Sequence, residues 1–183
     1  MTLPGKLDWA PALDHPQLLA PPVQAALSAF AGAGEVFVAP IDPDLADTAA
    51  FCERYDVGPE VSANCVVVAG KREGEQRIAG CVILATTRAD VNGAARRRLD
   101  VRKASFLAVA EAVELTAMEY GGITPIGLPA AWPLLVDAAV VSAGMVVIGS
   151  GIRGSKLALP ATALADLPRA EVLDGLARPL NGS

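Results

Sequence analysis

An uninterrupted apolar run from Cys65 to Ala69 limits the possible folds of this chain more than any other segment. It consists of a cysteine, three valines and an alanine, and such a run favours a strand that is buried on both faces. The polar stretch 70–76 indicates a turn, and a second apolar run, Ile78 to Thr86, is the expected partner strand. The sequence therefore predicts a buried antiparallel hairpin at the centre of the fold.

Helices and further strands are expected to surround this hairpin. Pro22 suits the first position of a helix, so residues 1–34 are interpreted as an N-terminal lead-in and helix. The other expected helices are 44–58 and 90–99, capped by Asp44 and Asp90, and then 109–116 and 161–167. The other expected strands are 35–41, 104–106, 134–137, 145–149 and 156–159. Short links between several strands favour a mixed sheet over a doubly wound parallel one.

Length and composition indicate one folded unit. The chain has 183 residues, of which 52% are hydrophobic, and its net charge is −5. A chain of this length buries about 70% of its unfolded surface on folding. The high apolar fraction argues against intrinsic disorder, which accompanies few apolar residues and a high net charge.

The single histidine excludes many common mechanisms. His15 lies between Asp14 and Pro16, before any regular pattern begins. A Ser-His-Asp triad, a Cys-His pair or a His-rich zinc site would depend on this one residue. We interpret His15 as a solvated loop residue, so the chemistry of the protein is expected to proceed without imidazole.

The three cysteines, Cys52, Cys65 and Cys81, contain no CxxC pair that could form a zinc knuckle or a thioredoxin-type motif. They are interpreted as small apolar residues in a reducing compartment. The N-terminus lacks the pattern of a signal peptide, and the longest uncharged run, 16–34, contains two adjacent prolines. We therefore expect a cytoplasmic protein with no membrane span, no metal and no cofactor.

Positive charge is concentrated in residues 71–103, although the chain as a whole is acidic. This span holds nine basic and four acidic side chains. Polyanions such as RNA respond to local positive potential rather than to net charge. The candidate contacts are Arg96, Arg97, Arg102 and Lys103. The alternative is an ordinary solvated helix face, because three consecutive arginines point in different directions around a helix.

Two glycine-rich segments are candidate binding loops. The first runs from Tyr120 to Pro129 and contains Gly121 and Gly122, and the second, 149–155, contains Arg153 between glycines. Glycine lets a backbone approach a ligand closely, and consecutive free N–H groups form a concave donor site for a carbonyl oxygen or an oxyanion. Each segment alone is a weak signal, because most glycine-rich turns are only turns.

Two polar residues stand at the ends of apolar strands. Asp137 ends the strand 134–137, where it is as well suited to capping a helix as to a site. Asn64 opens the valine-rich strand, and the alternation of a strand places it on the same face as Ser62 and opposite Cys65.

The order of these segments resembles the YbaK-type aminoacyl-tRNA editing family, which is related to the editing domain inserted in bacterial prolyl-tRNA synthetases. The resemblance covers roughly residues 35–166. The segments that carry it, in order, are the valine-rich strand from Cys65, then Arg102-Lys103-Ala104-Ser105, Glu114-Leu115-Thr116, Gly121-Gly122-Ile123-Thr124-Pro125-Ile126-Gly127, Leu134-Leu135-Val136-Asp137, Gly151-Ile152-Arg153-Gly154 and Lys156-Leu157-Ala158-Leu159.

The resemblance implies a single compact α/β domain over residues 35–183, with a mixed, partly barrel-like sheet and surrounding helices. It implies that the ester between a wrong amino acid and the 3′ end of a tRNA is hydrolysed. It also implies a homodimer or an association with a synthetase as possible assemblies. The family's GxxxP loop corresponds to Gly121, Gly122, Ile123, Thr124 and Pro125, and its other pocket segments correspond to Asp137, Gly151, Arg153 and Gly154. Asn64 stands where family members usually carry a lysine.

These observations leave three hypotheses. The first is a deacylase in which the amides of Gly121–Pro125 hold the ester carbonyl, Asn64 orients it, and water or a ribose hydroxyl attacks. The second is a non-catalytic module that binds an aminoacyl or nucleotide-like group, since Asn64 replaces the lysine. The third is an enzyme that acts on a free small-molecule ester or amide, which would suit the acidic net charge.

Overall fold

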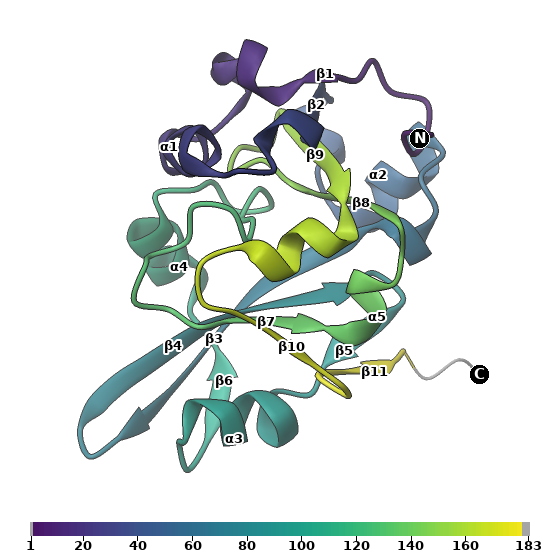
Figure 1. The fold of residues 1–183 in the computed structure, drawn as a ribbon. Helices are drawn as coiled ribbons and strands as arrows, with labels where there is room; N and C mark the ends of the chain where they lie inside the picture. Colours follow the sequence, from purple (N-terminus) through teal and green to yellow (C-terminus); the bar gives the residue numbers. More distant parts are fainter. Residues whose placement is uncertain (1, 181–183) are drawn as a thin grey trace.

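The structure is a computed structural model that describes residues 2–180. Its strands form a four-stranded sheet of order β1-β2-β9-β8, a five-stranded sheet of order β10-β7-β4-β3-β6 and a small ribbon of β11 and β5 (Figure 1). The strands are β1 (Ala10–Pro11), β2 (Phe37–Pro40), β3 (Ala63–Arg72), β4 (Glu75–Leu84), β5 (Thr87–Ala89), β6 (Ala104–Phe106), β7 (Leu134–Asp137), β8 (Met145–Gly149), β9 (Ser155–Pro160), β10 (Ala170–Leu173) and β11 (Ala177–Pro179). The α-helices are α1 (Pro21–Ala29), α2 (Thr48–Tyr55), α3 (Arg96–Leu99), α4 (Val109–Thr116) and α5 (Ala138–Val141).

The predicted central hairpin is confirmed, and it is longer than expected. β3 and β4 pair without a break from Ala63 opposite Leu84 to Arg72 opposite Glu75. The turn is therefore only Glu73-Gly74, and both residues have positive φ, as the tightest hairpin turns require. The middle of the hairpin is fully buried at Val68, Cys81 and Val82. The outer end extends away from the body of the molecule (Figure 1).

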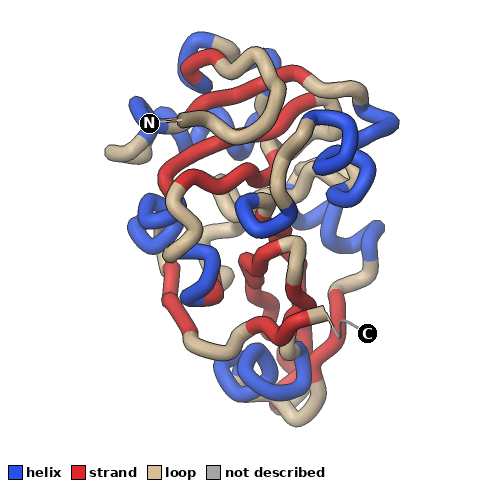
Figure 2. The backbone as a smooth tube through the Cα atoms, turned by 90° about the vertical axis from the view of Figure 1, so that its right-hand side faces the viewer, coloured by secondary structure: helices blue, strands red, loops and turns tan. Residues whose placement is uncertain are grey.

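The mixed sheet is also confirmed, but the strands do not close into a barrel. β7 runs parallel to both β4 and β10, whereas β3 is antiparallel to β4 and to β6. The two main sheets form two separate groups of strands (Figure 2). Within residues 2–180 they are connected by one parallel bridge, between Ser62 and Val147. The two sheets therefore part on either side of this bridge.

The helices agree with the prediction in place but differ at their ends. Asp44 does not cap α2, because it lies in a short 3-10 turn whose own cap is Asp42, which accepts a hydrogen bond from the Asp44 amide at 3.0 Å. Asp90 does cap its helix, which begins as a π-helical turn before α3. The predicted helix at 161–167 is the 3-10 helix η7 (Ala161–Asp166).

The N-terminal residues pack into the same core as the sheets. Val23 and Leu27 of α1 are buried in a cluster with residues of both sheets. The Ala20 amide donates to the Ser150 carbonyl at 3.1 Å, and the Ser155 hydroxyl donates to the Leu18 carbonyl at 2.5 Å. Residues 149–155 are thus held in place by the chain that precedes α1.

None of the helices within residues 2–180 combines the length and the apolar character needed to cross a bilayer.

Candidate functional site

A cavity of about 350 Å³ opens where the two sheets part. Among the described residues, β6 pairs with the edge of β3 only from Val68 onward, and β8 forms a bridge to that edge only at Ser62. The stretch of β3 between these points borders the cavity. The lining comes from the start of α2, the beginning of β3, the β6–α4 link, the first glycine-rich segment and the facing ends of β8 and β9; its members are Ala46, Asp47, Thr48, Ser62, Ala63, Asn64, Cys65, Val66, Val67, Phe106, Leu107, Val109, Ala112, Tyr120, Gly121, Ile123, Val147, Ile148, Gly149 and Lys156.

The backbone of β3 offers hydrogen-bonding groups to this cavity. In an antiparallel pair, alternate residues direct their N–H and C=O groups to the same neighbour. The Ser62 carbonyl accepts from Ala85, which follows β4, whereas the Val67 carbonyl accepts from Leu107 on the opposite side. The N–H and C=O of Cys65 share the direction of Val67 and therefore point to the side of the cavity. The Cys65 side chain packs against the main core instead.

Asn64 lies in the cavity lining and is held from one side. The Thr48 hydroxyl at the start of α2 donates to the Asn64 carbonyl oxygen, Oδ1, at 2.7 Å. The amide nitrogen, Nδ2, has no acceptor within the described residues, so it can donate to a ligand. Asn64 is thus a neutral donor in a fixed orientation.

The first glycine-rich segment contributes Gly121 and Ile123 to the cavity wall, whereas Gly122 is buried behind them. The Gly122 amide already donates to the Glu119 carbonyl at 2.9 Å, so it is not available to a ligand. The amides of Gly121 and Ile123 have no acceptor within the part of the chain that the structure describes. The amide of Tyr120, which also lines the cavity, has no acceptor among the described residues either, so the loop offers the cavity a few separate donors rather than a continuous row.

Apart from Gly149, which lines the cavity, the second glycine-rich segment supports the first. The Gly151 amide donates to the Gly122 carbonyl at 2.8 Å, and a Cβ on Gly122 would lie 2.7 Å from backbone atoms of Ile152. The Arg153 guanidinium donates to the carbonyls of Tyr120 and Pro43, each at 3.2 Å. Arg153 therefore fixes the loop in position.

Gly154 also has a supporting role, because its carbonyl accepts from the Ile41 amide at 2.9 Å.

Three further predicted site residues lie away from the cavity lining. Thr124 is fully buried and its hydroxyl has no partner within residues 2–180, and Pro125 lines a separate apolar cavity beside α1. Asp137 accepts from the amides of Ala139 and Ala177, at 3.0 and 2.8 Å, so its carboxylate caps α5 and secures β11.

Lys156 is a cavity residue that the sequence analysis did not single out. It lies on β9, its side chain is buried, and its Nζ donates to the Ala46 carbonyl at 3.0 Å. Burial lowers the pKa of Lys156 from 10.5 to about 8. The signal in the sequence was the alternation of β9, which places Lys156 on the same face as the buried Ala158.

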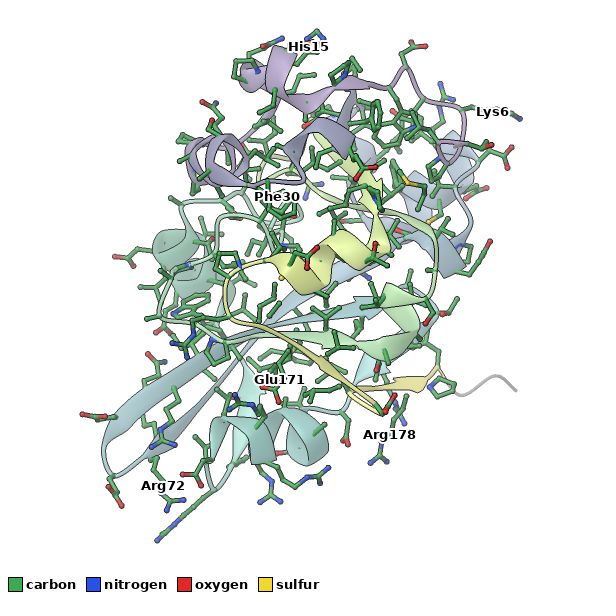
Figure 3. The ribbon with its side chains drawn as sticks, in the orientation of Figure 1. Lys6, His15, Phe30, Arg72, Glu171 and Arg178 are labelled. Carbon is green, nitrogen blue, oxygen red and sulfur yellow. The ribbon has the colours of Figure 1, made fainter. Side chains whose placement is uncertain are left out.

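The four basic candidates lie at the other end of β6. Arg97, Arg102 and Lys103 are exposed, and Arg96 donates to the backbone carbonyls of Asn92 and Arg102. They share this end of the molecule with the outer part of the β3–β4 hairpin, where Figure 3 shows Arg72. Arg72 is paired with Asp100 at 2.9 Å. The basic region is therefore separate from the cavity lining and is connected to it by β6.

Histidine and cysteine side chains give the cavity no reactive group. His15 lies at the opposite end of the molecule from Arg72 (Figure 3), where its ring faces Gln17 at 3.3 Å. Burial raises the pKa of the Cys65 thiol above its ordinary value of 9.0 and that of Cys81 to about 12, so both are thiols at neutral pH. No three His, Cys, Asp or Glu side chains in the described part of the chain gather as metal ligands would.

The fold and the cavity together define a mixed α/β domain with a cavity between two open sheets. Residues 42–167 match the aminoacyl-tRNA editing domain family, and the chain belongs to that family. None of the curated proteins is similar enough in sequence to count as a match.

Solved structures show the same fold at low sequence identity. A protein provisionally described as a trans-editing enzyme for prolyl tRNA synthetase is 21% identical, with a TM-score of 0.71 over 85% of this chain and 94% of that one. A scaffold used for computational epitope grafting is 22% identical, with a TM-score of 0.71 over 88% and 97%. The hypothetical protein APE2540 is 22% identical, with a TM-score of 0.64 over 76% and 86%.

Proposed function

We propose that this protein hydrolyses the ester that joins an amino acid to the 3′ end of a tRNA. The observation that carries the proposal is the cavity between the sheets. In a chain of the editing domain family, this cavity brings together Asn64, the free amides of Gly121 and Ile123, and the edge of β3. A concave apolar site with a few converging donors suits a small acyl group.

The rim of the cavity suits the nucleoside that carries the ester. Phe106 and Tyr120 belong to the lining and yet are 60% and 59% exposed. Exposed aromatic rings stack on nucleobases, with about 1–3 kcal/mol per base in other systems. Asp47, at the start of α2, is an exposed carboxylate of the same rim and can attract the α-ammonium of the aminoacyl group. We therefore place the terminal adenosine at the rim and the amino acid inside.

The reaction requires little from titrating side chains. Water attacks the ester carbonyl carbon, the bond from that carbon to the ribose oxygen breaks, and the ribose oxygen takes up a proton. The products are the free amino acid and the tRNA hydroxyl. Attack by the neighbouring ribose hydroxyl would only move the ester, so water is the nucleophile. Donors such as the Gly121 and Ile123 amides stabilise the charge that develops on the carbonyl oxygen, and one such donor is worth about 10²–10³ in rate.

The basic end of β6 gives the tRNA a path to the rim. Lys103 precedes β6 and Phe106 ends it, so about 10 Å of strand lies between the Cα positions of these two exposed residues. A tRNA whose backbone lies against Arg97, Arg102 and Lys103 can place its 3′ end at Phe106. Binding of this kind depends on displaced counterions and weakens with salt.

The test is hydrolysis of a panel of tRNAs, each mischarged with a different amino acid. We expect the protein to release one or a few small amino acids faster than the uncatalysed rate. Selectivity between amino acids that differ by one methylene is expected to be about 10–200-fold, the range of an apolar pocket. Uncatalysed decay across the whole panel would contradict the proposal. Hydrolysis only of free aminoacyl esters, with no salt-dependent tRNA binding, would favour an enzyme for small-molecule esters.

A second candidate function is a binding module without hydrolysis. It is favoured by Asn64, a neutral amide whose carbonyl oxygen is already engaged by Thr48. Asn64→Lys distinguishes the two functions, with Gln17→Lys as a control for added charge at an exposed position. If hydrolysis appears only in Asn64→Lys, the natural chain binds its ligand without cleaving it. Hydrolysis by the natural chain and by the control at equal rates supports the deacylase.

A further inference from the structure

Lys156 is a buried cation without a charged partner. Only 8% of the residue is exposed, and it is the only basic side chain lining the cavity among residues 2–180. Its one hydrogen bond goes to the neutral Ala46 carbonyl, and no carboxylate of the described residues lies within 4.0 Å of its Nζ. Burying an ammonium in this way is unfavourable. Two of its three N–H donors remain free for a ligand.

The charged groups around Lys156 do not compensate for its burial. Burial disfavours the ammonium most and Arg153 adds to that effect, whereas Cys52 and Asp47 favour the ammonium without offsetting the burial. The Phe51 ring is 5.2 Å from the Nζ and gives a modest stabilisation. Asp47 pairs with Arg153 at 3.9 Å, so its charge is shared. An electron-rich group of a ligand would therefore complete the site.

The backbone of the glycine loop lies beside this ammonium. Lys156 on β9 is directly opposite Gly149 on β8, so both residues face the same side of the sheet. The space of a side chain at Gly149 is filled by the first glycine-rich segment, because a Cβ there would lie 2.4 Å from the Gly122 carbonyl oxygen. Directly opposite residues have Cβ positions about 5 Å apart. The loop with the free amides of Gly121 and Ile123 is thus the immediate neighbour of Lys156.

We propose that Lys156 provides the positive charge that binds the ester carbonyl oxygen of the aminoacyl group and stabilises the negative charge that forms there. This inference rests on the proposed deacylase function. It assigns the charged role to β9, while the neutral Asn64 on β3 contributes an ordinary hydrogen bond. A charge-assisted hydrogen bond is about twice as strong as a neutral one, and its strength grows as the carbonyl oxygen becomes an oxyanion.

A purely structural role for Lys156 is the competing explanation, and a set of variants separates the two. Lys156→Met keeps the length and packing of the side chain and removes the charge. Lys156→Arg keeps the charge with different geometry. Lys6→Met removes an exposed lysine that pairs only with Asp56 and lies outside the cavity lining. Thermal unfolding of each variant identifies any that does not fold, and Lys156→Gln replaces Lys156→Met in that case.

The first measurement is the single-turnover rate on the best mischarged tRNA of the panel. We expect Lys156→Met to lose at least 100-fold in rate with less than a 10-fold change in tRNA affinity. Lys156→Arg is expected to recover part of the rate, and Lys6→Met to match the natural chain. A folded Lys156→Met variant within 3-fold of the natural rate would overturn the inference and leave the deacylase function intact.

The second measurement does not depend on hydrolysis. The probe is an adenosine that carries an amino acid through a 3′ amide, and the readout is the NMR signal of the lysine Nζ groups in isotopically labelled protein. We expect one signal, absent from Lys156→Met, to shift when the probe binds. If the natural chain hydrolyses no tRNA, the deacylase function fails while this shift still supports the contact. Failure of the probe to bind, or binding without a shift, would overturn the inference.

Discussion

Replacing Lys156 by methionine is expected to change the stability of the protein in a way that depends on pH. In the folded protein, burial lowers the pKa of this ammonium from 10.5 to about 8. The unfolded chain exposes the side chain, so its pKa there is the ordinary one. At about 1.4 kcal/mol per pKa unit, the charged lysine makes the folded state about 3 kcal/mol less stable than it would be with a neutral side chain.

The sign of the change in stability with pH depends on whether the folded or the unfolded protein binds the lysine proton. Below pH 8 both the folded and the unfolded protein carry it, and the folded state bears the full cost. Between pH 8 and 10.5 the unfolded chain binds the proton and the folded protein does not, so the stability of the natural chain rises with pH. Lys156→Met has no such proton. It also loses the hydrogen bond to the Ala46 carbonyl, which is worth about 1 kcal/mol at any pH.

We therefore expect Lys156→Met to be about 2 kcal/mol more stable than the natural chain at pH 7 and about 1 kcal/mol less stable at pH 11. Urea unfolding at several pH values between 6.5 and 11 measures the difference, and groups that do not interact with Lys156 cancel in it. Lys6→Met, an exposed lysine, is the control and is expected to show a difference that does not vary with pH. A flat difference for Lys156→Met as well would refute the reasoning.

Three further outcomes are expected. Gly122→Ala should lower the free energy of unfolding in urea by about 1–3 kcal/mol, because the added Cβ would lie 2.7 Å from backbone atoms of Ile152. Gly34→Ala is the control, because a Cβ there has no atom within 4 Å, and it should leave the stability unchanged. Equal effects of the two substitutions would contradict the packing argument. Asp137→Ala should lose about 1–3 kcal/mol of stability while its KM for tRNA stays unchanged, and a raised KM would restore Asp137 to the site. Replacing Arg102 and Lys103 by alanine should weaken tRNA binding and make it less sensitive to salt, and an unchanged salt dependence would place the tRNA elsewhere.

The sequence predicted those parts of the fold that depend on local patterns. The valine-rich strand and its partner were correctly paired because an apolar run next to a polar turn has few other arrangements. β10 (Ala170–Leu173) was missed because its four residues carry only a short pattern. Its partner, β7, lies more than thirty residues away in the sequence, and its parallel pairing is decided by tertiary packing. Propensity alone cannot fix such a long-range register.

The candidate site was predicted only in part, for reasons that individual residues show. Asn64 and Gly121 do line one cavity. Asp137 ends a strand, and that position serves a helix cap as well as a ligand, so the sequence left both readings open. Lys156 was hidden in an ordinary strand pattern because its neighbours in the cavity come from the chain just before α2 and from the glycine loop, which only the fold brings to β9.

Within residues 2–180 one bridge, between Ser62 and Val147, joins the two sheets, and this has a consequence for how the domain could change its specificity. With the sheets connected at one point, the width of the opening is set by the angle between them, and that angle depends on the volume of the side chains packed further inside. An exchange of one core residue for a larger or smaller one would change the angle between the sheets and so alter the size of amino acid that fits. New preferences could then arise in evolution without any change to the groups that touch the substrate.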